Sequence, residues 1–600
     1  MSIARQNTLR IEDYALIGDC KTAALVGRDG SIDWLCWPRF DSGACLCALV
    51  GDASNGRFHI APVVDGKAVG FATSRSYAGP TMILETVWET ATGTVALIDF
   101  MVPETDFGTL IRMVECRAGT VDMRMELCLR FDYGQSVPWV TQREGGNGIV
   151  AISGPDMVVL RTDVDLRGED MITVADFTVR AGERVPFALT HCASHLDVPM
   201  GLDSIDALYK TKMFWTEWSK RCSYHGEWAP AISRSLLTLK CLTDRVTGGI
   251  VAAPTTSLPE EIGGVRNWDY RFCWLRDASL TLFAFMEAGY FDEAESWSEW
   301  LQRSAAGSPA QVQIMYGIAG ERRLDEWEVQ GLSGYEGSKP VHIGNAASKQ
   351  LQIDVYGEVC SALNRARRGN LLSESFAWPL QCELLAHLET LWCKPDSGLW
   401  ETRGGEKNFT FSKVMAWVAY SRSIEDAENN RLEAPLDRWR QIRDEIFHTV
   451  CEQGFNEELN SFIQVFGETQ LDASLLLIPV VGFLPGDDPR VVGTIAAIEK
   501  GLVEDGFVLR YRPSKQADGL PGREGAFLAC SFWLAQAKFL AGQQDEARKL
   551  FLRLLDICND VGLLSEEYNP HEKRFTGNFP QAFSHVALVT TALLLDGVRQ

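Results

Sequence analysis

The sequence has little histidine and lacks the short motifs that mark the commonest enzyme classes. Nine histidines in 600 residues leave little material for imidazole chemistry. The chain contains no phosphate-binding P-loop, no dinucleotide-binding glycine motif that opens a helix, no His-Glu-x-x-His and no Gly-x-Ser-x-Gly. These absences argue against nucleotide, zinc-protease and serine-hydrolase chemistry. Carboxylates are left as the main candidates for catalysis.

Long apolar runs are also missing. No stretch approaches the ~20 apolar residues needed to cross a bilayer, and Met1–Tyr14 has no apolar core of a signal peptide. The formal net charge is −23 and the isoelectric point is about 4.9, so the chain repels phosphate backbones and anionic lipids. We therefore expect a cytoplasmic protein that binds neither nucleic acid nor membranes. The oligomeric state stays open, a homo-oligomer included.

Cysteine is present, but it is not arranged for disulfides or for metal binding. Sixteen cysteines are scattered singly along a long chain without an export signal, which is typical of reduced, buried thiols. The one close pair, Cys45 and Cys47, lacks the two-residue spacer of a zinc site and has no histidine nearby. The sequence therefore predicts no metal site.

Two patterns of apolar residues divide the chain into two parts. Six hundred residues exceed the size at which one hydrophobic core keeps growing, so more than one domain is expected. From about residue 20 to about residue 200 apolar residues recur at every second position, as in Met123, Met125 and Leu127. Turn signals such as Asp65-Gly66 separate these runs. The pattern predicts an N-terminal antiparallel β-sandwich over residues 1–200.

From about residue 225 onward the apolar spacing becomes helical. About a dozen such segments follow one another, among them Leu236–Leu242 and Ala582–Leu593. Residues 201–228, with Trp215 and Trp218, are predicted to form a linking helix, and residues 229–600 an all-α domain. A dozen helices in pairs fit a toroid of helical hairpins, but the spacing alone leaves other all-α packings open.

Three segments of the helical part place carboxylates beside aromatic rings at helix edges. They are residues 267–277, 397–401 and 564–568. Such surroundings raise a carboxyl pKa, and the rings can stack on a sugar. Hydrolysis of a glycosidic bond needs two carboxyl groups, one to protonate the leaving oxygen and one to attack or to activate water. At least two of these carboxylates would have to converge at one site for such a reaction.

These segments resemble family 15 of the glycoside hydrolases, which includes glucoamylases, glucodextranases, isomaltose glucohydrolases and α,α-trehalases. Residues 11–19 (IEDYALIGD), 30–36 (GSIDWLC) and 38–42 (PRFDS) resemble the bacterial branch that contains the trehalases. The resemblance covers essentially the whole chain. It implies a β-sandwich followed by an (α/α)6 barrel, in agreement with the change of period.

The resemblance also implies a role for each carboxylate. Glu401, in the segment LWE, matches the general acid of glucoamylases, and Glu566, in the segment SEEY, matches the general base. Glu567 is a second candidate for the base by residue type alone. The family mechanism inverts the anomeric carbon with a water molecule between the two carboxyl groups, which implies a separation of roughly 6.5–9.5 Å.

Seven further residues are expected to bind the substrate. Arg276 and Asp277 match a pair that grips hydroxyls of the terminal glucose, because Asp accepts hydrogen bonds while Arg donates a planar fork. Arg510 and Glu524 match a substrate-binding loop less closely, since glucoamylases carry Gly-Asn-Pro-Trp there. The expected set is Tyr270, Trp274, Arg276, Asp277, Trp400, Arg510 and Glu524.

The resemblance and the missing export signal together predict the reaction. We expect an inverting, exo-acting α-glucoside hydrolase that releases glucose, with α,α-trehalose as the first substrate. A glucoamylase-, glucodextranase- or isomaltose glucohydrolase-type activity is the alternative. A glycoside phosphorylase and a catalytically silent sugar-binding protein are less favoured, because the acid and the base are both present.

The two-carboxylate mechanism requires no metal and no organic cofactor. Two questions stay open at this point. One is whether the β-domain, for example around Asp41, reaches the pocket. The other is whether Asp354 and Glu358, four residues apart on an expected helix, have a function.

Overall fold

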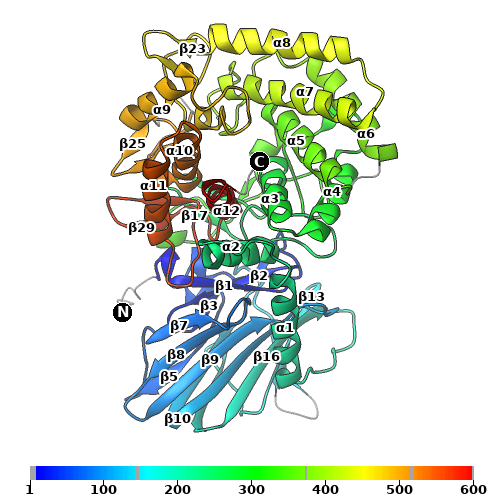
Figure 1. Ribbon diagram of the computed structural model, residues 1–600. Helices are drawn as coiled ribbons and strands as arrows, with labels where there is room; N and C mark the ends of the chain where they lie inside the picture. The colour runs from blue at the N-terminus through cyan, green and yellow to red at the C-terminus, as the bar shows by residue number, and fades with distance from the viewer. Residues whose placement is uncertain (1–8, 144–147, 372–373, 513–518, 598–600) are drawn as a thin grey trace.

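A computed structural model describes residues 9–143, 148–371, 374–512 and 519–597. It places a β-rich part against a ring of helices (Figure 1). The first eight and the last three residues of the predicted domains lie outside this description. Among the described helices, none combines the length and the apolar character that a bilayer crossing requires.

The β-rich part consists of two antiparallel layers, which confirms the predicted N-terminal β-domain. The first layer has the order β1 (Tyr14–Gly18), β2 (Ala23–Gly27), β3 (Ser31–Cys36), β5 (Arg57–Val64), β10 (Thr109–Cys128), β15 (Ile172–Arg180) and β14 (Arg167–Glu169). The second has the order β7 (Ser74–Tyr77), β8 (Leu84–Glu89), β9 (Gly93–Met101), β10, β16 (Arg184–Ala193), β13 (Asp156–Thr162), β12 (Gly148–Ser153) and β11 (Trp139–Gln142). The short strands β4 (Ala44–Leu46) and β6 (Lys67–Ala68) pair with β3 and β5.

The long strand β10 belongs to both layers. Its first half, from Thr109 to Glu115, pairs with β16, and its second half, from Thr120 to Leu127, pairs with β15. The register shifts between Cys116 and Ala118, where a bulge lets the strand turn from one layer into the other. The alternating residues of the second half, Met123, Met125 and Leu127, are buried, as their spacing predicts.

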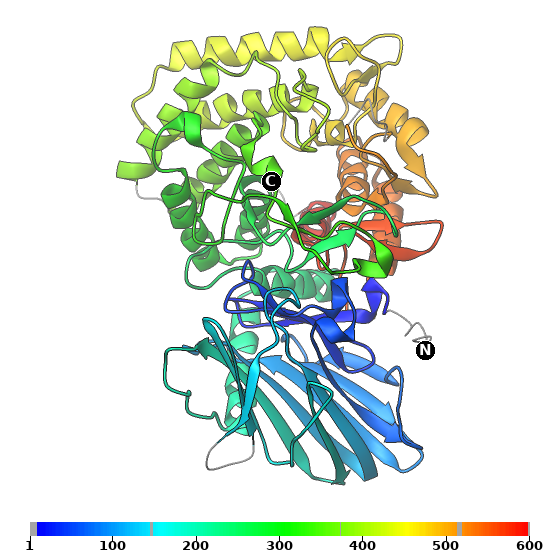
Figure 2. The same cartoon turned by 180° about the vertical axis from the view of Figure 1, so that it is seen from behind.

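The helical part is an (α/α)6 barrel, which confirms the predicted fold (Figures 1 and 2). Within the described residues, the inner ring is formed by α3 (Leu275–Glu287), α5 (Asp354–Arg368), α7 (Thr410–Asn430), η7 (Ala473–Leu477), α10 (Leu528–Leu540) and α12 (Ala582–Leu595). The outer helices are α2 (Ala229–Cys241), α4 (Phe291–Ala305), α6 (Glu374–Glu389), α8 (Leu436–Gln453), α9 (Pro489–Leu502) and α11 (Gln544–Asp556). The ring closes where α2, the first of these helices, packs against α12, the last.

Burial explains which helices are inner and which are outer. Residues Ala582 to Leu594 of α12 are all buried, so this helix is apolar on every side. In contrast, α11 buries only Ala547, Phe551 and Leu554. The fourth inner position holds the short 3-10 helix η7, which begins at the cap residue Asp472.

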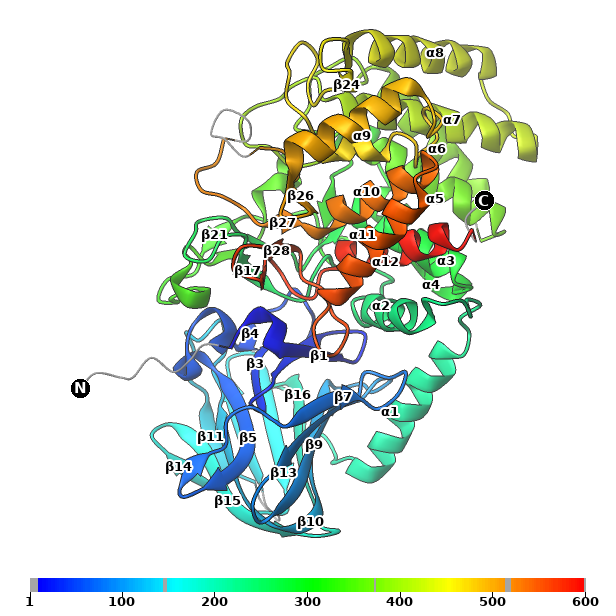
Figure 3. The ribbon, with the colours of Figure 1, turned by 60° about the vertical axis from the view of Figure 1, so that its left-hand side comes forward.

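The two parts of the molecule pack directly on each other. Helix α1 (Ser204–Ser219) runs beside the β-layers to the ring (Figure 3). The indole N–H of Trp34 donates to the carbonyl of Pro254 at 2.7 Å. The buried guanidinium of Arg271 donates to the Ser42 carbonyl at 2.8 Å and to the Tyr133 hydroxyl at 2.9 Å. The β-part therefore supports the strand region that carries Tyr270.

Short β-ribbons decorate the loops of the ring. They are β17 (Thr256–Pro259) with β18 (Asn267–Asp269), β19 (Cys273–Trp274) with β20 (Met315–Tyr316), β21 (Trp327–Glu328) with β22 (His342–Ile343), β23 (Phe455–Asn456) with β24 (Ser461–Phe462), β25 (Val503–Glu504) with β26 (Phe507–Val508), and β27 (Ala526–Phe527) with β28 (Glu567–Asn569) and β29 (Arg574–Thr576).

Candidate active site

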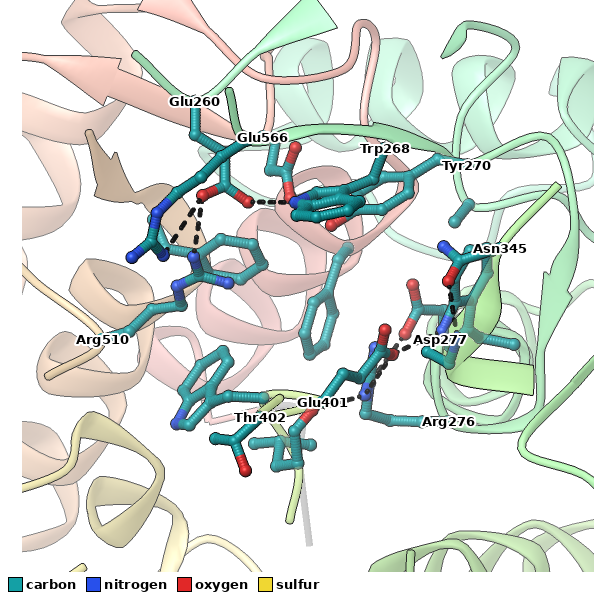
Figure 4. A pocket seen from close by; sticks show the side chains of 18 of the residues that line it. Glu260, Trp268, Tyr270, Arg276, Asp277, Asn345, Glu401, Thr402, Arg510 and Glu566 are labelled. Carbon is teal, nitrogen blue, oxygen red and sulfur yellow. Dashed lines mark hydrogen bonds and ion pairs between the residues drawn. The ribbon is translucent and has the colours of Figure 1, made fainter. Parts of the chain in front are cut away.

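One cavity lies at the end of the barrel where the inner helices begin (Figure 4). It brings together eight of the nine predicted site residues, which are Tyr270, Trp274, Arg276, Asp277, Trp400, Glu401, Arg510 and Glu566. All of its lining residues lie between Ala252 and Phe583, so no described residue of the β-part lines it. Asp41 instead binds Arg39 and accepts a long hydrogen bond, 3.4 Å, from the Ile318 N–H.

Glu401 lies in a tight turn before α7. Its backbone N–H donates to the Gly398 carbonyl, and its own φ is +58°. Oε1 accepts a 2.6 Å hydrogen bond from the indole N–H of Trp274, and the Arg276 guanidinium lies 3.8 Å away. Burial raises the pKa of the Glu401 carboxyl, while Arg276 and Trp274 oppose the shift. A raised pKa suits a group that must hold a proton before it acts.

Glu566 directly precedes β28 and is almost completely buried. Its Oε2 accepts a hydrogen bond of 3.1 Å from the Asn578 N–H, whereas Oε1 has no hydrogen-bond partner among the described residues. Burial and then the Glu260 carboxylate raise the pKa of Glu566 to about 8, while the Tyr270 hydroxyl and Arg510 oppose the shift. A general base must be ionised, so at neutral pH only the ionised fraction of Glu566 can act as one, and this fraction grows as the pH rises through 8. Glu566 lines the cavity, and its unpartnered Oε1 retains the capacity to accept a hydrogen bond.

The neighbouring Glu567 points elsewhere, because successive side chains of a strand point to opposite faces. Its Oε2 accepts a hydrogen bond of 2.8 Å from the Gly525 N–H, and its Oε1 lies 3.6 Å from the Arg510 guanidinium. Glu567 does not line the cavity. This arrangement supports Glu566 over Glu567 as the base.

Arg276 and Asp277 occupy the first turn of α3. The two side chains form an ion pair of 2.8 Å, and the Arg276 guanidinium also donates to the Leu399 carbonyl at 3.0 Å. Burial raises the pKa of Asp277, and Arg276 opposes this shift. The pair therefore presents an acceptor and a planar donor together, as a polar sugar ring requires.

Trp400 and Arg510 form another wall of the cavity. The Trp400 indole N–H donates to the Asp472 carboxylate at 2.9 Å, so the residue that caps η7 also fixes this ring. The Arg510 guanidinium carbon lies 5.5 Å from the Trp400 ring centre, within the range of a cation–π interaction.

Glu524 is not among the residues that line the cavity. Its buried carboxylate lies behind the wall and pairs with Arg510 at 2.5 Å and with Arg266 at 3.1 Å. The expected substrate contact is therefore replaced by a positioning contact, since Glu524 fixes the guanidinium that faces the cavity.

Glu260 is a wall residue that the sequence did not reveal. It is buried, lines the cavity, accepts from the Trp268 indole N–H at 3.1 Å and lies 3.3 Å from the Arg510 guanidinium. Its partner Arg510 is 250 residues away in the chain, so no local pattern links the two.

Glu260, Glu524 and Glu567 also form a compact acidic group. One carboxylate oxygen of each lies within 4.8 Å of the others. The guanidinium groups of Arg266 and Arg510 lie against this group. The charges that a metal ion would neutralise are thus already balanced in part by two arginines.

Two family comparisons agree with this geometry. Residues 229–593 match the glycosyl hydrolases family 15, and residues 3–190 match the trehalase-like N-terminal domain. The chain belongs to glycosyl hydrolases family 15. This family 15 protein is 36% identical to a trehalase of Mycolicibacterium smegmatis, over 97% of this chain and 91% of that one. It is 34% identical to a trehalase of Thermoplasma volcanium, over 98% and 94% of the two chains.

The fold comparison agrees as well. A crystal structure of a bacterial glucoamylase complexed with acarbose superposes with a TM-score of 0.74, covering 98% of this chain and 94% of that chain. The sequences are 14% identical, so this likeness concerns the fold alone.

Proposed function

We propose that this family 15 protein hydrolyses α,α-trehalose to two glucose molecules with inversion, using Glu401 as general acid and Glu566 as general base. The observation that carries the proposal is the meeting of these two carboxyl groups at one cavity, from loops far apart in the chain. Their different partners support different roles. Glu401 is held by Trp274 and Arg276, and Glu566 keeps one oxygen without a partner.

The reaction follows from these positions. Arg276 and Asp277 hold hydroxyls of one glucose unit at the bottom of the cavity. Glu401 gives its proton to the glycosidic oxygen while the bond to the anomeric carbon breaks. A water molecule attacks that carbon from the other face, and Oε1 of Glu566 takes its proton. We expect the two carboxyl groups to be roughly 6.5–9.5 Å apart, because a water molecule must fit between them.

Tyr270 also lines the cavity and supports this arrangement. Burial and the Glu566 carboxylate raise the pKa of the Tyr270 hydroxyl well above its ordinary value. The hydroxyl therefore stays protonated and can donate to the attacking water or to the base.

The choice of trehalose rests on the relatives. The trehalases of Mycolicibacterium smegmatis, Mycobacterium tuberculosis and Thermoplasma volcanium each match at least 97% of this chain, including the β-domain. Leu399, Arg276 and Phe583 line both this cavity and a second cavity along the barrel, so they lie between the two. We expect them to stop the substrate at a terminal glucose, which corresponds to exo-action.

A substrate panel tests this proposal. Purified protein is incubated with trehalose, isomaltose, kojibiose, maltose and dextran, with and without phosphate, and released glucose is measured. We expect the highest kcat/KM for trehalose and no requirement for phosphate as co-substrate. A higher kcat/KM for isomaltose or maltose would reject trehalose as the substrate, and formation of glucose 1-phosphate would indicate a phosphorylase.

A further inference from the structure

The second cavity lies along the barrel axis, beside the candidate active site. It is lined by later turns of the same inner helices, from Glu358 to Arg368 on α5 and from Val586 to Leu594 on α12. Arg276, Leu399 and Phe583 line both cavities. These three side chains therefore lie between the second cavity and the candidate active site.

The middle of this second cavity is apolar. Its walls carry the side chains of Phe283, Phe411, Met415, Val418, Trp533 and Val586. Cavities with such walls bind apolar groups more readily than they hold ordered water, which needs several polar partners. The wall therefore suits a hydrocarbon segment of a ligand.

Glu358 provides a polar group at the deep end. The residue is 6% exposed and lines the cavity, and its side chain makes no hydrogen bond or ion pair within the part of the chain that the structure describes. Burial and then Asp354 raise the pKa of Glu358 to about 8, so the carboxyl is mostly protonated at neutral pH. The Glu358 carboxyl lines the cavity, where it can exchange a hydrogen bond with a hydroxyl group of a ligand.

The opposite end of the cavity carries positive charge. Arg365 and Arg368 come from the last turn of α5, and Arg422 comes from α7. Arg365 pairs with Glu287, whereas Arg368 and Arg422 both pair with Glu425. Within the part of the chain that the structure describes, three guanidinium groups thus pair with two carboxylates, so cationic side chains outnumber their acidic partners at this end of the cavity.

We propose that the second cavity binds an elongated amphiphile with an anionic group at one end and a hydroxyl at the other, such as an ω-hydroxy fatty acid. The anion binds at Arg365, Arg368 and Arg422, the chain lies against the apolar wall, and the hydroxyl bonds to Glu358. Glu358 and Arg368 are ten residues apart on α5, which corresponds to about 15 Å at 1.5 Å per residue. A ligand with a hydrocarbon chain of medium length spans this distance.

A ligand in the second cavity changes the affinity for the substrate, because Arg276 lines both cavities. We expect an occupant to change KM for trehalose several-fold, within the ~5–150-fold range of allosteric coupling, with a smaller change in kcat. Only this kinetic readout rests on the proposed function. Direct binding does not, so the two proposals fail separately.

Calorimetry on the full chain with three probes tests the proposal. The probes are 10-hydroxydecanoate, decanoate and 1,10-decanediol, each below its aggregation concentration. We expect 10-hydroxydecanoate to bind one-to-one, about two- to tenfold tighter than decanoate, because it adds one hydrogen bond. The diol lacks the anion and should bind more weakly.

Two variants assign the binding to this cavity. Glu358→Leu should remove the preference for the hydroxylated probe. Arg368→Gln should weaken the binding of both carboxylate probes, 10-hydroxydecanoate and decanoate. Arg438→Gln is the matched control, since Arg438 pairs with Glu389 away from the cavity and should leave binding unchanged. Absent binding, equal binding in all variants, or displacement of the probe by trehalose in direct competition would overturn the proposal. Circular dichroism melting curves confirm that each variant is folded.

Discussion

The indole N–H of Trp274 lies 2.6 Å from Oε1 of Glu401 and donates a hydrogen bond to it. Trp274 is the last residue before α3, so the start of an inner helix holds the proposed general acid. The bond favours the ionised carboxylate and counteracts part of the rise in pKa that burial causes. We therefore expect Trp274 to tune the proposed acid in addition to lining the cavity.

Trp274→Phe tests this role. Loss of the N–H raises the pKa of Glu401 further, so the acid gives up its proton less readily, and kcat should fall by about tenfold. The limb of the pH–rate profile that reports Glu401 should move to higher pH. Trp297→Phe is the matched control, because the buried Trp297 indole N–H has no hydrogen-bond partner among the described residues. A lower kcat with an unmoved limb would contradict the role.

Glu260→Gln is expected to change the pH profile rather than the fold. The Glu260 carboxylate raises the pKa of Glu566, which reaches about 8. Removal of this negative charge should move the limb near pH 8 to lower pH, while the amide oxygen can still accept from Trp268. Measurement of kcat/KM between pH 4 and pH 9 shows the shift. An unchanged profile would limit Glu260 to a structural role.

Glu566→Gln and Glu567→Gln distinguish the two adjacent carboxylates. Glu566 lines the cavity and Glu567 does not, so only Glu566→Gln removes the base. It should lower kcat by ~10²–10⁴-fold, the usual cost of losing a general base. Glu567→Gln should leave most of kcat intact. Any remaining effect should come from a displaced Arg510 side chain, which Glu567 contacts. A larger loss of kcat in Glu567→Gln than in Glu566→Gln would identify Glu567 as the base instead.

Gly577→Ala should displace the base. A Cβ on Gly577 would lie 2.5 Å from Oε2 of Glu566, and the backbone φ there is +72°. Gly66→Ala matches the backbone strain, with φ of +74° and no atom within 4 Å of the added Cβ. We expect a drop in kcat of at least tenfold for Gly577→Ala alone. Equal activities in the two variants would show that Glu566 tolerates the displacement.

We expect Glu358 to make the stability of the protein depend on pH. Its folded-state pKa of about 8 lies above the ordinary 4.5 of a glutamate. Its contribution is therefore complete below about pH 4.5 and is lost as the pH rises through 8, by up to about 1.4 kcal/mol per pH unit. Denaturant unfolding of Glu358→Gln should show a smaller loss of stability across this window. Parallel curves for the two proteins would contradict the assignment.

Much of the fold follows from the sequence, because periods of two and of 3.6 are local signals. The (α/α)6 arrangement needed the family resemblance. The sharing of β10 between both layers depends on long-range pairing, of Thr109 with Thr190 on β16 and of Thr120 with Arg180 on β15, and spacing alone cannot indicate it. The short η7 also escapes prediction, since its packing against α9 and α10 fixes it.

Prediction of the site from the sequence is limited in the same way, by contacts between distant segments. Glu401, Glu566 and the Arg276–Asp277 pair were predicted from short segments that resemble the family, and the structure places all four at one cavity. Glu260 was missed, and Glu524 was expected in the cavity rather than behind Arg510. Both outcomes depend on how Arg510 is shared among carboxylates from distant loops. Long-range ion pairs of this kind leave no periodic pattern in the chain.

The most direct test of the central claim is ¹H NMR of the first products formed from trehalose, before mutarotation. Attack by a water molecule held by Glu566, with protonation by Glu401, inverts one anomeric carbon and releases the other glucose unchanged. Inversion therefore predicts β-glucose and α-glucose in equal initial amounts. Formation of α-glucose alone would contradict it, because that result requires retention through a covalent intermediate.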